Sequence, residues 1–540
     1  MAILAKLANI AQLVEHVHGK DEVIGSIPIV GSRMRPLYFK VVVLFLVLTW
    51  SGFFLSSQID LSTADLGRHI ANGRVLVEAP WAEKWGVLHT NFFSYTMPRA
   101  EFVNHHWLSG VVFYLVEYLS GFVGLSIFYV LISISSILLF WNVARKLSNF
   151  YLASLLVFLL TPLLAYRAEV RPEMWTYFFS GIFLNLLFFR RHLWLLPVLT
   201  LLWVNLHIGF VFGFLILGSF GLEELVKRVR GMENDFSQIF YISLASFLLA
   251  LVNPFGYKLL LYPFQIFQDY GYRIVENQSV RFLEGINFTQ GMHFLLYKIL
   301  GVGVVLAVVG AKWGRLRVPL SITVSTLVLL VISYFGVRHI ALFSLFALVL
   351  LSTFLYNFSR EKYFDYCVLL VVFVSVFSLI SGSQDLLERK DRIGWGLASG
   401  QSASADFFRG NHLSGLIFNN YDVGGYLIYH LYPEEKVYVD NRPEAYNKEF
   451  FSRGYILPQE SEERWRELEK QYGFNVIFFS HRDYTPWGQK FLSERLRDES
   501  WVPVFVDSYN IIFLKRNTLN MELISKFAIP RDQFGVAPNQ

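Results

Sequence analysis

The chain has 540 residues, of which 54% are hydrophobic and only 16% are charged. Because about a quarter of the residues in soluble domains are charged, this composition excludes an ordinary soluble protein and indicates a membrane protein. The formal charge of +5 comes from basic residues in short clusters between apolar runs, which argues against a nucleic-acid partner. Cys367 is the only cysteine, so neither an intrachain disulfide nor a cysteine-ligated zinc site is available.

The first 33 residues differ from the rest of the chain. AQLVEHVHGKDEVIGSIPIVGS (11–32) resembles a translated transfer-RNA gene, and Met34 starts a short basic head, MRPLYFK, directly before an apolar run. Membrane insertion favours such a head before a span. We therefore interpret residues 1–33 as a spurious extension from a misplaced start codon, with a genuine amphipathic or disordered extension as the alternative.

Apolar stretches long enough to cross a bilayer recur through residues 34–381. Taking about 20 residues per span, we expect eleven, near 38–56, 122–143, 150–166, 174–189, 193–208, 209–226, 237–254, 292–311, 318–336, 339–357 and 363–381. With this set the basic clusters between the spans all fall on one side, which the positive-inside rule makes cytoplasmic. The protein then lies in the cytoplasmic membrane with its amino end in the cytoplasm and everything after residue 381 outside.

Two stretches decide this topology. Residues 105–121 are apolar but short and contain Glu117, so we interpret them as a helix on the outer interface that closes the first outer loop, 57–121. Residues 193–222 are long enough for a single helix of about 45 Å. Their basic flanks and the break at Asn205, His207 and Gly209 favour a tight hairpin of two short spans.

Residues 382–540 have the character of a small α/β domain on the outer face. We expect strands over 415–431, 436–440 and 475–479, helices over 461–473 and 488–499, and a closing hairpin over 501–516. Asp422, Gly424 and Gly425, and the run Asp440–Asn441–Arg442, fall at the ends of predicted strands. Ligands often bind at such places, although glycines and acids there more commonly make turns.

The unusual polar residues collect on the predicted outer side of the membrane. If TADLGRHIANG (63–73) is helical, Asp65, Arg68, His69 and Asn72 share one face. The other outer loops and turns hold His105, His106, Arg167, Glu169, Arg171, Glu173, Asn205, His207, Glu276, Arg338 and His339. Ionisable groups near hydrocarbon cost a few kcal/mol each unless they pair or line a wet cavity. Their one-sided distribution therefore predicts a polar cavity at the outer leaflet.

An acid beside a histidine and several arginines suits chemistry at a phosphate. Arginine forks bind phosphate or pyrophosphate bidentately, and a carboxylate can accept a proton from a hydroxyl or hold a divalent metal. A cavity that opens at the outer leaflet can admit a lipid whose phosphate lies at headgroup level. These features predict transfer of a sugar from a polyprenyl-phosphate carrier.

Seven short motifs resemble those of one family. They are DLGRHIANG (65–73), FFSYT (92–96), NHHWL (104–108), RPE (171–173), WVNLHIG (203–209), NPFG (253–256) and RHI (338–340). In this order they resemble the GT-C glycosyltransferase superfamily, which includes the protein O-mannosyltransferases and the Rgt-type lipopolysaccharide sugar transferases. The resemblance covers residues 38–360, and 417–446 is similar to the extracytoplasmic tail of many members. It implies an α-helical polytopic membrane domain followed by a C-terminal extracytoplasmic α/β domain.

The resemblance also implies roles for individual residues. The catalytic or metal-holding acid of the family follows the first span, where Asp65 lies, with Asp60 as the alternative; the second acid is Glu169 or Glu173. His69 joins the catalytic group, and Asp65, His69 and His106 are the candidate ligands of a divalent metal, although their spacing matches no closed zinc site. We assign donor and phosphate binding to Arg68, His105, His106, Arg171, Asn205, His207, Glu276, Arg338 and His339.

The predicted activity is an inverting displacement in which Asp65 deprotonates the acceptor and arginines neutralise the departing phosphate. The predicted partners are a polyprenyl-phosphate sugar donor, membrane lipid, and a glycan, lipid or protein acceptor. The alternatives are an O-antigen polymerase or ligase, a transporter, or a non-catalytic scaffold of envelope polysaccharide assembly. A transporter's polar path should reach both membrane faces, and O-antigen enzymes keep their arginines and histidines in a large late loop, whereas here the first loop is the rich one.

Overall fold

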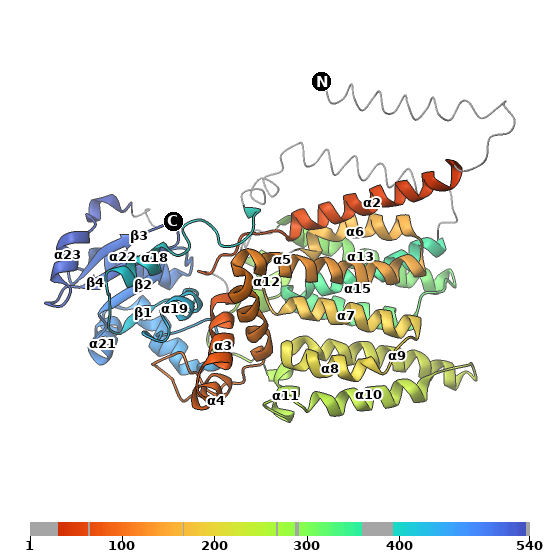
Figure 1. The fold of residues 1–540 in the computed structure, drawn as a ribbon, viewed down its shortest axis with the longest axis horizontal. Coiled ribbons are helices and arrows are strands. Elements are labelled where there is room, and N and C mark those ends of the chain that lie inside the picture. Colours follow the sequence, from red (N-terminus) through yellow and green to blue (C-terminus); the bar gives the residue numbers. More distant parts are fainter. Residues whose placement is uncertain are drawn as a thin grey trace, which may run out of the picture. The chain divides into compact units, whose positions relative to one another are not determined.

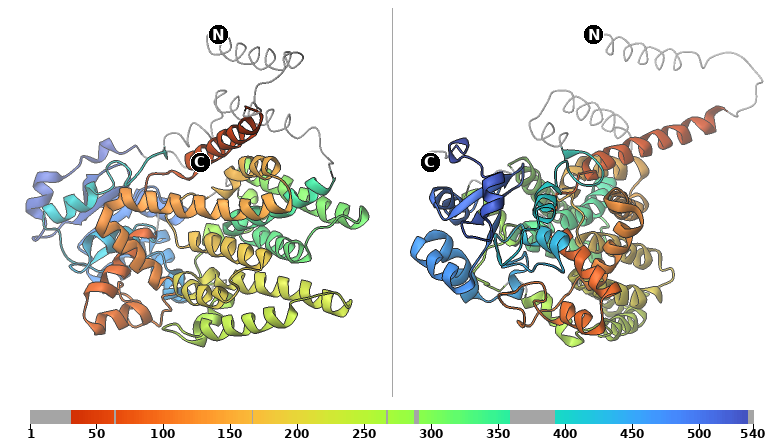
Figure 2. Two further views of the ribbon diagram at one scale, coloured as in Figure 1. Left: turned by 45° about the vertical axis from the view of Figure 1, so that its right-hand side comes forward. Right: turned by 60° about the vertical axis from the view of Figure 1, so that its left-hand side comes forward.

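The computed structural model describes residues 31–62, 65–165, 167–265, 268–286, 291–358 and 392–535 (Figures 1 and 2). The chain divides between Leu46 and Val47 into two compact units. The helical bundle from Val47 onward, the candidate site and the C-terminal sheet all belong to the second unit.

The described residues before 359 are mostly helical. Their elements are α2 (Gly31–Leu55), α3 (Leu66–Glu78), α4 (Trp81–His89), α5 (Trp107–Leu147), α6 (Phe150–Leu164), α7 (Glu173–Phe189), α8 (Leu195–Leu206), η1 (Ile208–Phe210), α9 (Val211–Val229), α10 (Phe236–Ala250), α11 (Tyr257–Gln265), η2 (Val275–Asn277), α12 (Val280–Gly285), α13 (Gly291–Trp313), α14 (Leu320–Phe335), η3 (Val337–His339) and α15 (Ile340–Phe358). The elements labelled η here are short 3-10 helices.

Several of these helices suit a bilayer. Within the described residues, the stretches long and apolar enough to cross it are Tyr38–Leu55, Trp107–Leu147, Ile208–Val229, His293–Trp313 and Val337–Asn357, and shorter apolar helices are Phe150–Leu164, Glu173–Phe189, Leu195–Leu206, Phe236–Ala250 and Leu320–Phe335. The protein is therefore a multi-pass membrane protein. Each of these helices overlaps a predicted span, while the eleventh span, 363–381, lies outside the described residues, so the number of spans stays a prediction.

The two stretches that decide the topology are broken where the sequence suggests. Helix α5 is interrupted at Gly121, whose φ of 64° and ψ of −174° separate the segment that begins at Trp107 from the long apolar part. Helix α8 ends at Leu206, and the extended backbone of His207 leads into η1 and α9. A Cβ on Gly213 of α9 would lie 3.0 Å from the Trp203 ring of α8, so the two helices pack closely as a hairpin.

The C-terminal domain is built on a four-stranded mixed sheet. The strand order is β1 (Ile417–Asn419), β2 (Val476–Ser480), β4 (Asn510–Lys515) and β3 (Trp501–Val506), with β1 and β2 parallel and the other pairs antiparallel. The surrounding helices and turns are α18 (Ala403–Gly410), α19 (Gly424–Leu431), η4 (Pro443–Ala445), η5 (Phe450–Ile456), α20 (Leu457–Glu460), α21 (Glu462–Tyr472), α22 (Pro486–Arg497), α23 (Met521–Phe527) and η6 (Arg531–Gln533).

The side chains of β2 alternate between two helical layers. Phe479 packs with Phe491 of α22, whereas the neighbouring Phe478 contacts Phe408 of α18 and Tyr426 of α19. This period of two is the normal geometry of a strand that is covered on both faces. The helices predicted at 461–473 and 488–499, the strand at 475–479 and the closing hairpin are confirmed.

Two predicted strands are wrong. Only Ile417–Asn419 of the predicted strand 415–431 is a strand, because the chain continues into helix α19. Residues 436–440 form no strand of the sheet, and Val437 makes an isolated bridge to Ser94 of the first outer loop. Both stretches are largely buried, and an apolar run does not by periodicity alone distinguish a buried strand from other buried structure.

Helix α3 lies between the membrane bundle and the C-terminal domain (Figures 1 and 2). Glycines permit its close packing on both sides. A Cβ on Gly73 would approach the Gly110 carbonyl oxygen of α5 to 2.1 Å, and a Cβ on Gly67 would approach the Gly425 oxygen of α19 to 2.7 Å. The backbone of Gly425 therefore lies against Gly67 of α3, and the ligand site considered at 422–425 stays a prediction.

Candidate functional site

Asp65 caps the amino end of α3, and the first turn of that helix holds its carboxylate. Arg68 Nη2 lies 3.4 Å and His69 Nε2 3.3 Å from Asp65 Oδ2, three and four residues along the helix as the sequence predicts. The alternative acid, Asp60, accepts hydrogen bonds from Ser62 and Gln401 instead. Asp65 is therefore the acid that joins the polar cluster.

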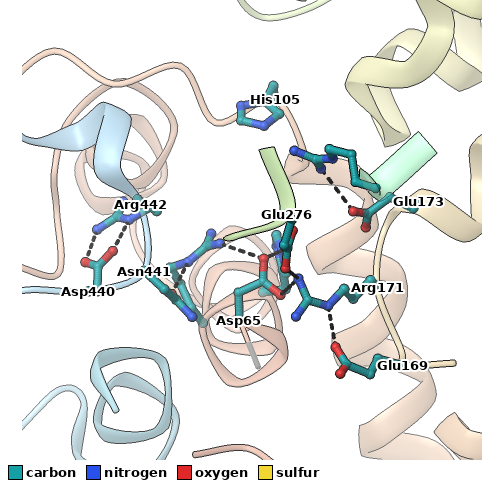
Figure 3. Close-up of polar contacts among 12 residues, drawn as sticks. Asp65, His105, Glu169, Arg171, Glu173, Glu276, Asp440, Asn441 and Arg442 are labelled. Atoms are coloured by element: carbon teal, nitrogen blue, oxygen red, sulfur yellow. Dashed lines mark hydrogen bonds and ion pairs between the residues drawn. The ribbon is translucent and has the colours of Figure 1, made fainter. Parts of the chain in front are cut away.

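Arg171 connects three carboxylates from three separate segments of the chain (Figure 3). Its Nε lies 2.6 Å from Glu169, and its Nη1 lies 2.8 Å from Glu276 and 4.0 Å from Asp65 Oδ1. Glu169 and Arg171 come from the turn between α6 and α7, and Glu276 comes from η2. The outer loops predicted to share a cavity therefore meet at this guanidinium.

The ion pairs continue from Glu276 toward α15. Arg167 bridges Glu276 at 2.6 Å and Glu173 at 3.1 Å, and Arg338 Nη2 lies 3.0 Å from the same Glu173 oxygen. Arg338 Nη1 also donates to Asn277 Oδ1 at 3.1 Å, a contact that the sequence reasoning missed. Residues as distant in sequence as Asp65 and Arg338 thus belong to one connected cluster.

This outer-loop cluster contains equal numbers of opposite charges. Its members are the carboxylates of Asp65, Glu169, Glu173 and Glu276 and the guanidinium groups of Arg68, Arg167, Arg171 and Arg338. Their formal charges sum to zero. Such compensation is what makes buried ionised groups tolerable at the edge of a membrane.

A row of histidine rings lies beside the acid. The ring centroids are 5.3 Å apart for His69 and His106 and 4.9 Å apart for His106 and His207, the latter pair being stacked. His207 Nδ1 accepts hydrogen bonds from the Gly209 amide at 3.1 Å and from the Thr176 hydroxyl at 2.7 Å. Its Nε2, which then carries the proton, has no hydrogen-bond partner among the described residues.

The candidate metal ligands do not converge. Within the described ranges, no group of three or more His, Cys, Asp or Glu side chains is arranged to hold a metal ion. His69 is engaged with Asp65, whereas His106 is stacked on His207. The predicted set of Asp65, His69 and His106 therefore does not form a metal site in this structure.

Three other candidates lie at the margin of the cluster. His105 Nδ1 donates to the Val103 carbonyl at 3.1 Å, and burial lowers the pKa of His105 to about 3, so its ring is neutral at physiological pH. Asn205 accepts from the Trp107 indole at 3.1 Å, so it serves packing between α8 and α5. His339 packs against Phe212.

Burial and neighbouring charges set the protonation of the acid and its histidine. Burial alone would raise the pKa of Asp65, but His69, Arg171 and Arg68 outweigh it and hold the pKa of Asp65 well below its usual range. Burial, reinforced by Arg68, lowers the pKa of His69. At neutral pH the pair is therefore a carboxylate that accepts a hydrogen bond from a neutral imidazole.

A largely apolar cavity of about 390 Å³ adjoins the Arg338 end of the cluster. Glu173, His207, Arg338 and His339 supply its polar wall, and the apolar wall includes Ile208, Phe212, Leu215, Phe264, Ile332 and Leu342. These residues come from α7, η1, α9, α11, α14, η3 and α15. A hydrocarbon chain could occupy the cavity while an anionic group meets Arg338.

The C-terminal domain also reaches the site. Asn441 Oδ1 accepts a hydrogen bond from Arg68 Nε at 3.2 Å, and Figure 3 shows Asn441 beside the pair of Asp440 and Arg442. Arg442 donates to both oxygens of Asp440, at 2.7 and 2.6 Å, and to Asn91 at 2.7 Å. The sequence reasoning marked this run as a strand end and did not link it to α3, because the pairing joins residues hundreds of positions apart.

Comparison with known proteins identifies the fold. No family profile and no curated protein match the sequence. The fold is similar to that of the oligosaccharyltransferase AglB from Archaeoglobus fulgidus in complex with an inhibitory peptide and a dolichol-phosphate, with a TM-score of 0.61 and 11% identity over 90% of this chain and 75% of that one. A complex of the enzyme with zinc and sulfate gives a TM-score of 0.53 at 11% identity, covering 88% and 73%. A form tethered to an acceptor peptide gives 0.55 at 11% identity, covering 89% and 74%.

These neighbours confirm the predicted fold class, an α-helical polytopic membrane protein with a C-terminal α/β domain. At 11% sequence identity, this similarity shows the fold and nothing about the activity. The narrower resemblance to protein O-mannosyltransferases and Rgt-type transferases stays a prediction.

Proposed function

We propose that the protein transfers a sugar from a polyprenyl-phosphate carrier to an acceptor at the outer face of the cytoplasmic membrane. One observation carries this proposal: an apolar cavity ends at Arg338 and Glu173, which belong to the same ion-paired cluster as Asp65. A lipid chain, an anionic headgroup and a reacting hydroxyl would each find a suitable environment along this path.

The donor occupies the cavity in this proposal. Its hydrocarbon chain packs along α9 and α14, and its phosphate meets Arg338 and the unpartnered Nε2–H of His207. A guanidinium with an added N–H donor is a suitable binding set for a phosphate oxygen. The dolichol-phosphate in the complex of the archaeal enzyme supports this choice of carrier.

The chemistry is a displacement at the anomeric carbon. The acceptor oxygen attacks that carbon, the bond from the carbon to the phosphate oxygen breaks, and the electron pair leaves with the phosphate, whose charge the arginines stabilise. The acceptor proton passes to Asp65. A carboxylate with a lowered pKa is a weak base, so the proton moves late, when the hydroxyl has become acidic through bond formation.

The acceptor would approach from the side of the first outer loop and the C-terminal domain. Asn441 and Arg68 lie there next to Asp65. A glycan, lipid or protein hydroxyl satisfies this chemistry, and the acceptor peptide tethered to the archaeal enzyme supports a macromolecular acceptor. An O-antigen polymerase or ligase would use the same carrier and remains the second candidate.

The decisive experiment compares two neighbouring acids. Purified protein in lipid nanodiscs is incubated with radiolabelled polyprenyl-phosphate sugars, and release of the free lipid phosphate is measured. We expect turnover by the wild type and by Asp60→Asn, and a loss of at least about 100-fold for Asp65→Asn. Full activity of Asp65→Asn would show that another group is the acid, and no binding of any lipid-linked sugar by the wild type would remove the transferase proposal.

A further inference from the structure

We propose that Arg171 supplies, as part of the polypeptide, the positive charge that a divalent cation would supply to the acids of this site, so that the transfer reaction is independent of metal. Arg171 is then a positioning residue for Asp65. The catalytic consequence, transfer without a metal ion, rests on the proposed function. Its structural part, that the arginine excludes a cation, is testable without any substrate.

The arrangement around Arg171 resembles a cation site. Asp65, Glu169 and Glu276 approach it from the start of α3, the turn between α6 and α7, and η2. Carboxylates from separate segments that converge on one point are the ligands that hard divalent cations prefer. Here the point of convergence is a guanidinium whose side chain is only 17% exposed.

A divalent ion does not fit beside this arginine. Its carboxylate ligands would have to approach to about 2.0–2.6 Å, but Glu169 and Glu276 already lie 2.6 and 2.8 Å from the Arg171 nitrogens. The cluster is also neutral as it stands, so an added ion would leave two uncompensated positive charges in a buried place. The ion could enter only if Arg171 left.

The arginine leaves one oxygen of the acid without a hydrogen bond. Asp65 Oδ2 is held by Arg68 and His69, whereas Asp65 Oδ1 faces Arg171 at 4.0 Å, is buried, and accepts no hydrogen bond from the described residues. Arg171 therefore fixes the direction of the carboxylate electrostatically without occupying Oδ1. This buried oxygen is the one that an acceptor hydroxyl would have to reach.

The first test measures cation binding directly, with Mn²⁺ as the probe and its electron paramagnetic resonance spectrum as the readout. The proteins are the wild type, Arg171→Ala, Arg171→Lys, the double variant Arg171→Ala with Glu169→Gln, and the surface control Arg453→Ala, whose partner Glu449 is exposed. We expect bound Mn²⁺ only in Arg171→Ala. The lysine variant keeps the charge, and the double variant lacks one of the exposed ligands.

The second test measures activity in the presence of chelator and of Mn²⁺. We expect the wild type and Arg453→Ala to keep full activity in EDTA. Arg171→Ala should lose about 100-fold in EDTA, the cost of removing one preorganised charge, and regain at least about tenfold with Mn²⁺. A purely structural role for Arg171 predicts no rescue by metal.

Two results would overturn the inference. One is stoichiometric Mn²⁺ binding by the wild type or loss of its activity in EDTA. The other is an Arg171→Ala protein that is folded, as its gel-filtration profile and melting temperature show, but neither binds nor responds to Mn²⁺. Should Arg171→Ala not fold, Arg171→Gln takes its place in both tests. Absence of transfer by the wild type with every donor would contradict the proposed function, while Mn²⁺ binding would still decide the role of Arg171.

Discussion

The protein contains two sets of buried ion pairs, and they differ in how they are enclosed. In the C-terminal domain, Arg442 and Asp440 are completely buried and satisfy one another through paired hydrogen bonds. In the outer-loop cluster, the side chains of Arg167, Arg338 and Glu276 keep between 13% and 26% of their surface exposed, and Arg338 lines a cavity. The first set is closed to solvent and stabilises the loop between α19 and η4. The second set keeps part of its surface accessible.

The comparison shows that burial of charge does not by itself indicate a functional site. Arg442 of the closed pair donates to Asp440 and Asn91 and lies over the Phe102 ring at 4.7 Å, yet its Nη1 has no hydrogen-bond partner among the described residues. Asp65 Oδ1 of the outer-loop cluster and the nearby His207 Nε2 also lack partners there, but His207 lines the cavity beside Arg338. Unsatisfied groups beside a cavity, more than the charges themselves, point to a ligand.

The largest expected effect on stability comes from removing one partner of the buried Arg442–Asp440 ion pair. Arg442→Ala leaves Asp440 as a buried, unpaired charge, which should lower the free energy of unfolding by about 3–5 kcal/mol. Thermal unfolding followed by intrinsic fluorescence measures this, with Arg453→Ala as the exposed control. Loss of activity without a change in melting temperature would mean that Arg442 acts at the site and not in the fold.

A substitution in the outer-loop cluster should lower activity and leave stability almost unchanged. Arg338→Gln retains a donor for Asn277 but removes the charge that faces the cavity. We expect turnover of the lipid-linked donor to fall by about 30- to 300-fold, with a melting temperature close to that of the wild type. Equal losses of stability in Arg338→Gln and Arg442→Ala would erase the distinction between the two sets.

The smallest expected effect concerns Asp422, an acid of the C-terminal domain with no ion pair among the described residues. Burial, together with the nearby Asp483, raises the pKa of Asp422 to about 7. Because the folded protein holds this proton more tightly than the unfolded chain, the stability it contributes is complete below the ordinary pKa of an aspartate and is lost as pH rises toward 7. The wild type should therefore be less stable at pH 8 than at pH 5.

Asp422→Asn tests this dependence. The variant should remove the part of the decline that Asp422 causes, about 1–2 kcal/mol, less than the full shift implies because the side chain is partly exposed. Melting curves of both proteins at pH 5, 6, 7 and 8 provide the measurement. Parallel curves for the two proteins across this range would contradict the assignment.

Hydrophobic length and turn chemistry made most of the membrane part predictable. The helices that were expected are present in the described residues, including the break at His207, because apolar periodicity and polar interruptions act locally. The spacing of Asp65, Arg68 and His69 likewise fixed their mutual contacts, since residues three and four apart meet on a helix.

The features that could not be predicted depend on contacts between segments that are distant in the sequence. Helical spacing favoured Asp65 over Asp60, but only the structure shows the former bound to His69 and the latter to Gln401. The helix at Gly424–Leu431 was missed because its glycines and apolar residues suit a turn and a strand equally well. Arg167 stood out as a polar residue, but its place between Glu276 and Glu173 required the fold.

The hydrogen bond from Arg68 to Asn441 has a consequence for biogenesis. Asp65 is synthesised early, whereas Asn441, which accepts a hydrogen bond from its neighbour Arg68, follows more than three hundred positions later. The surroundings of Asp65 are therefore incomplete until the C-terminal domain has been synthesised and has folded against α3.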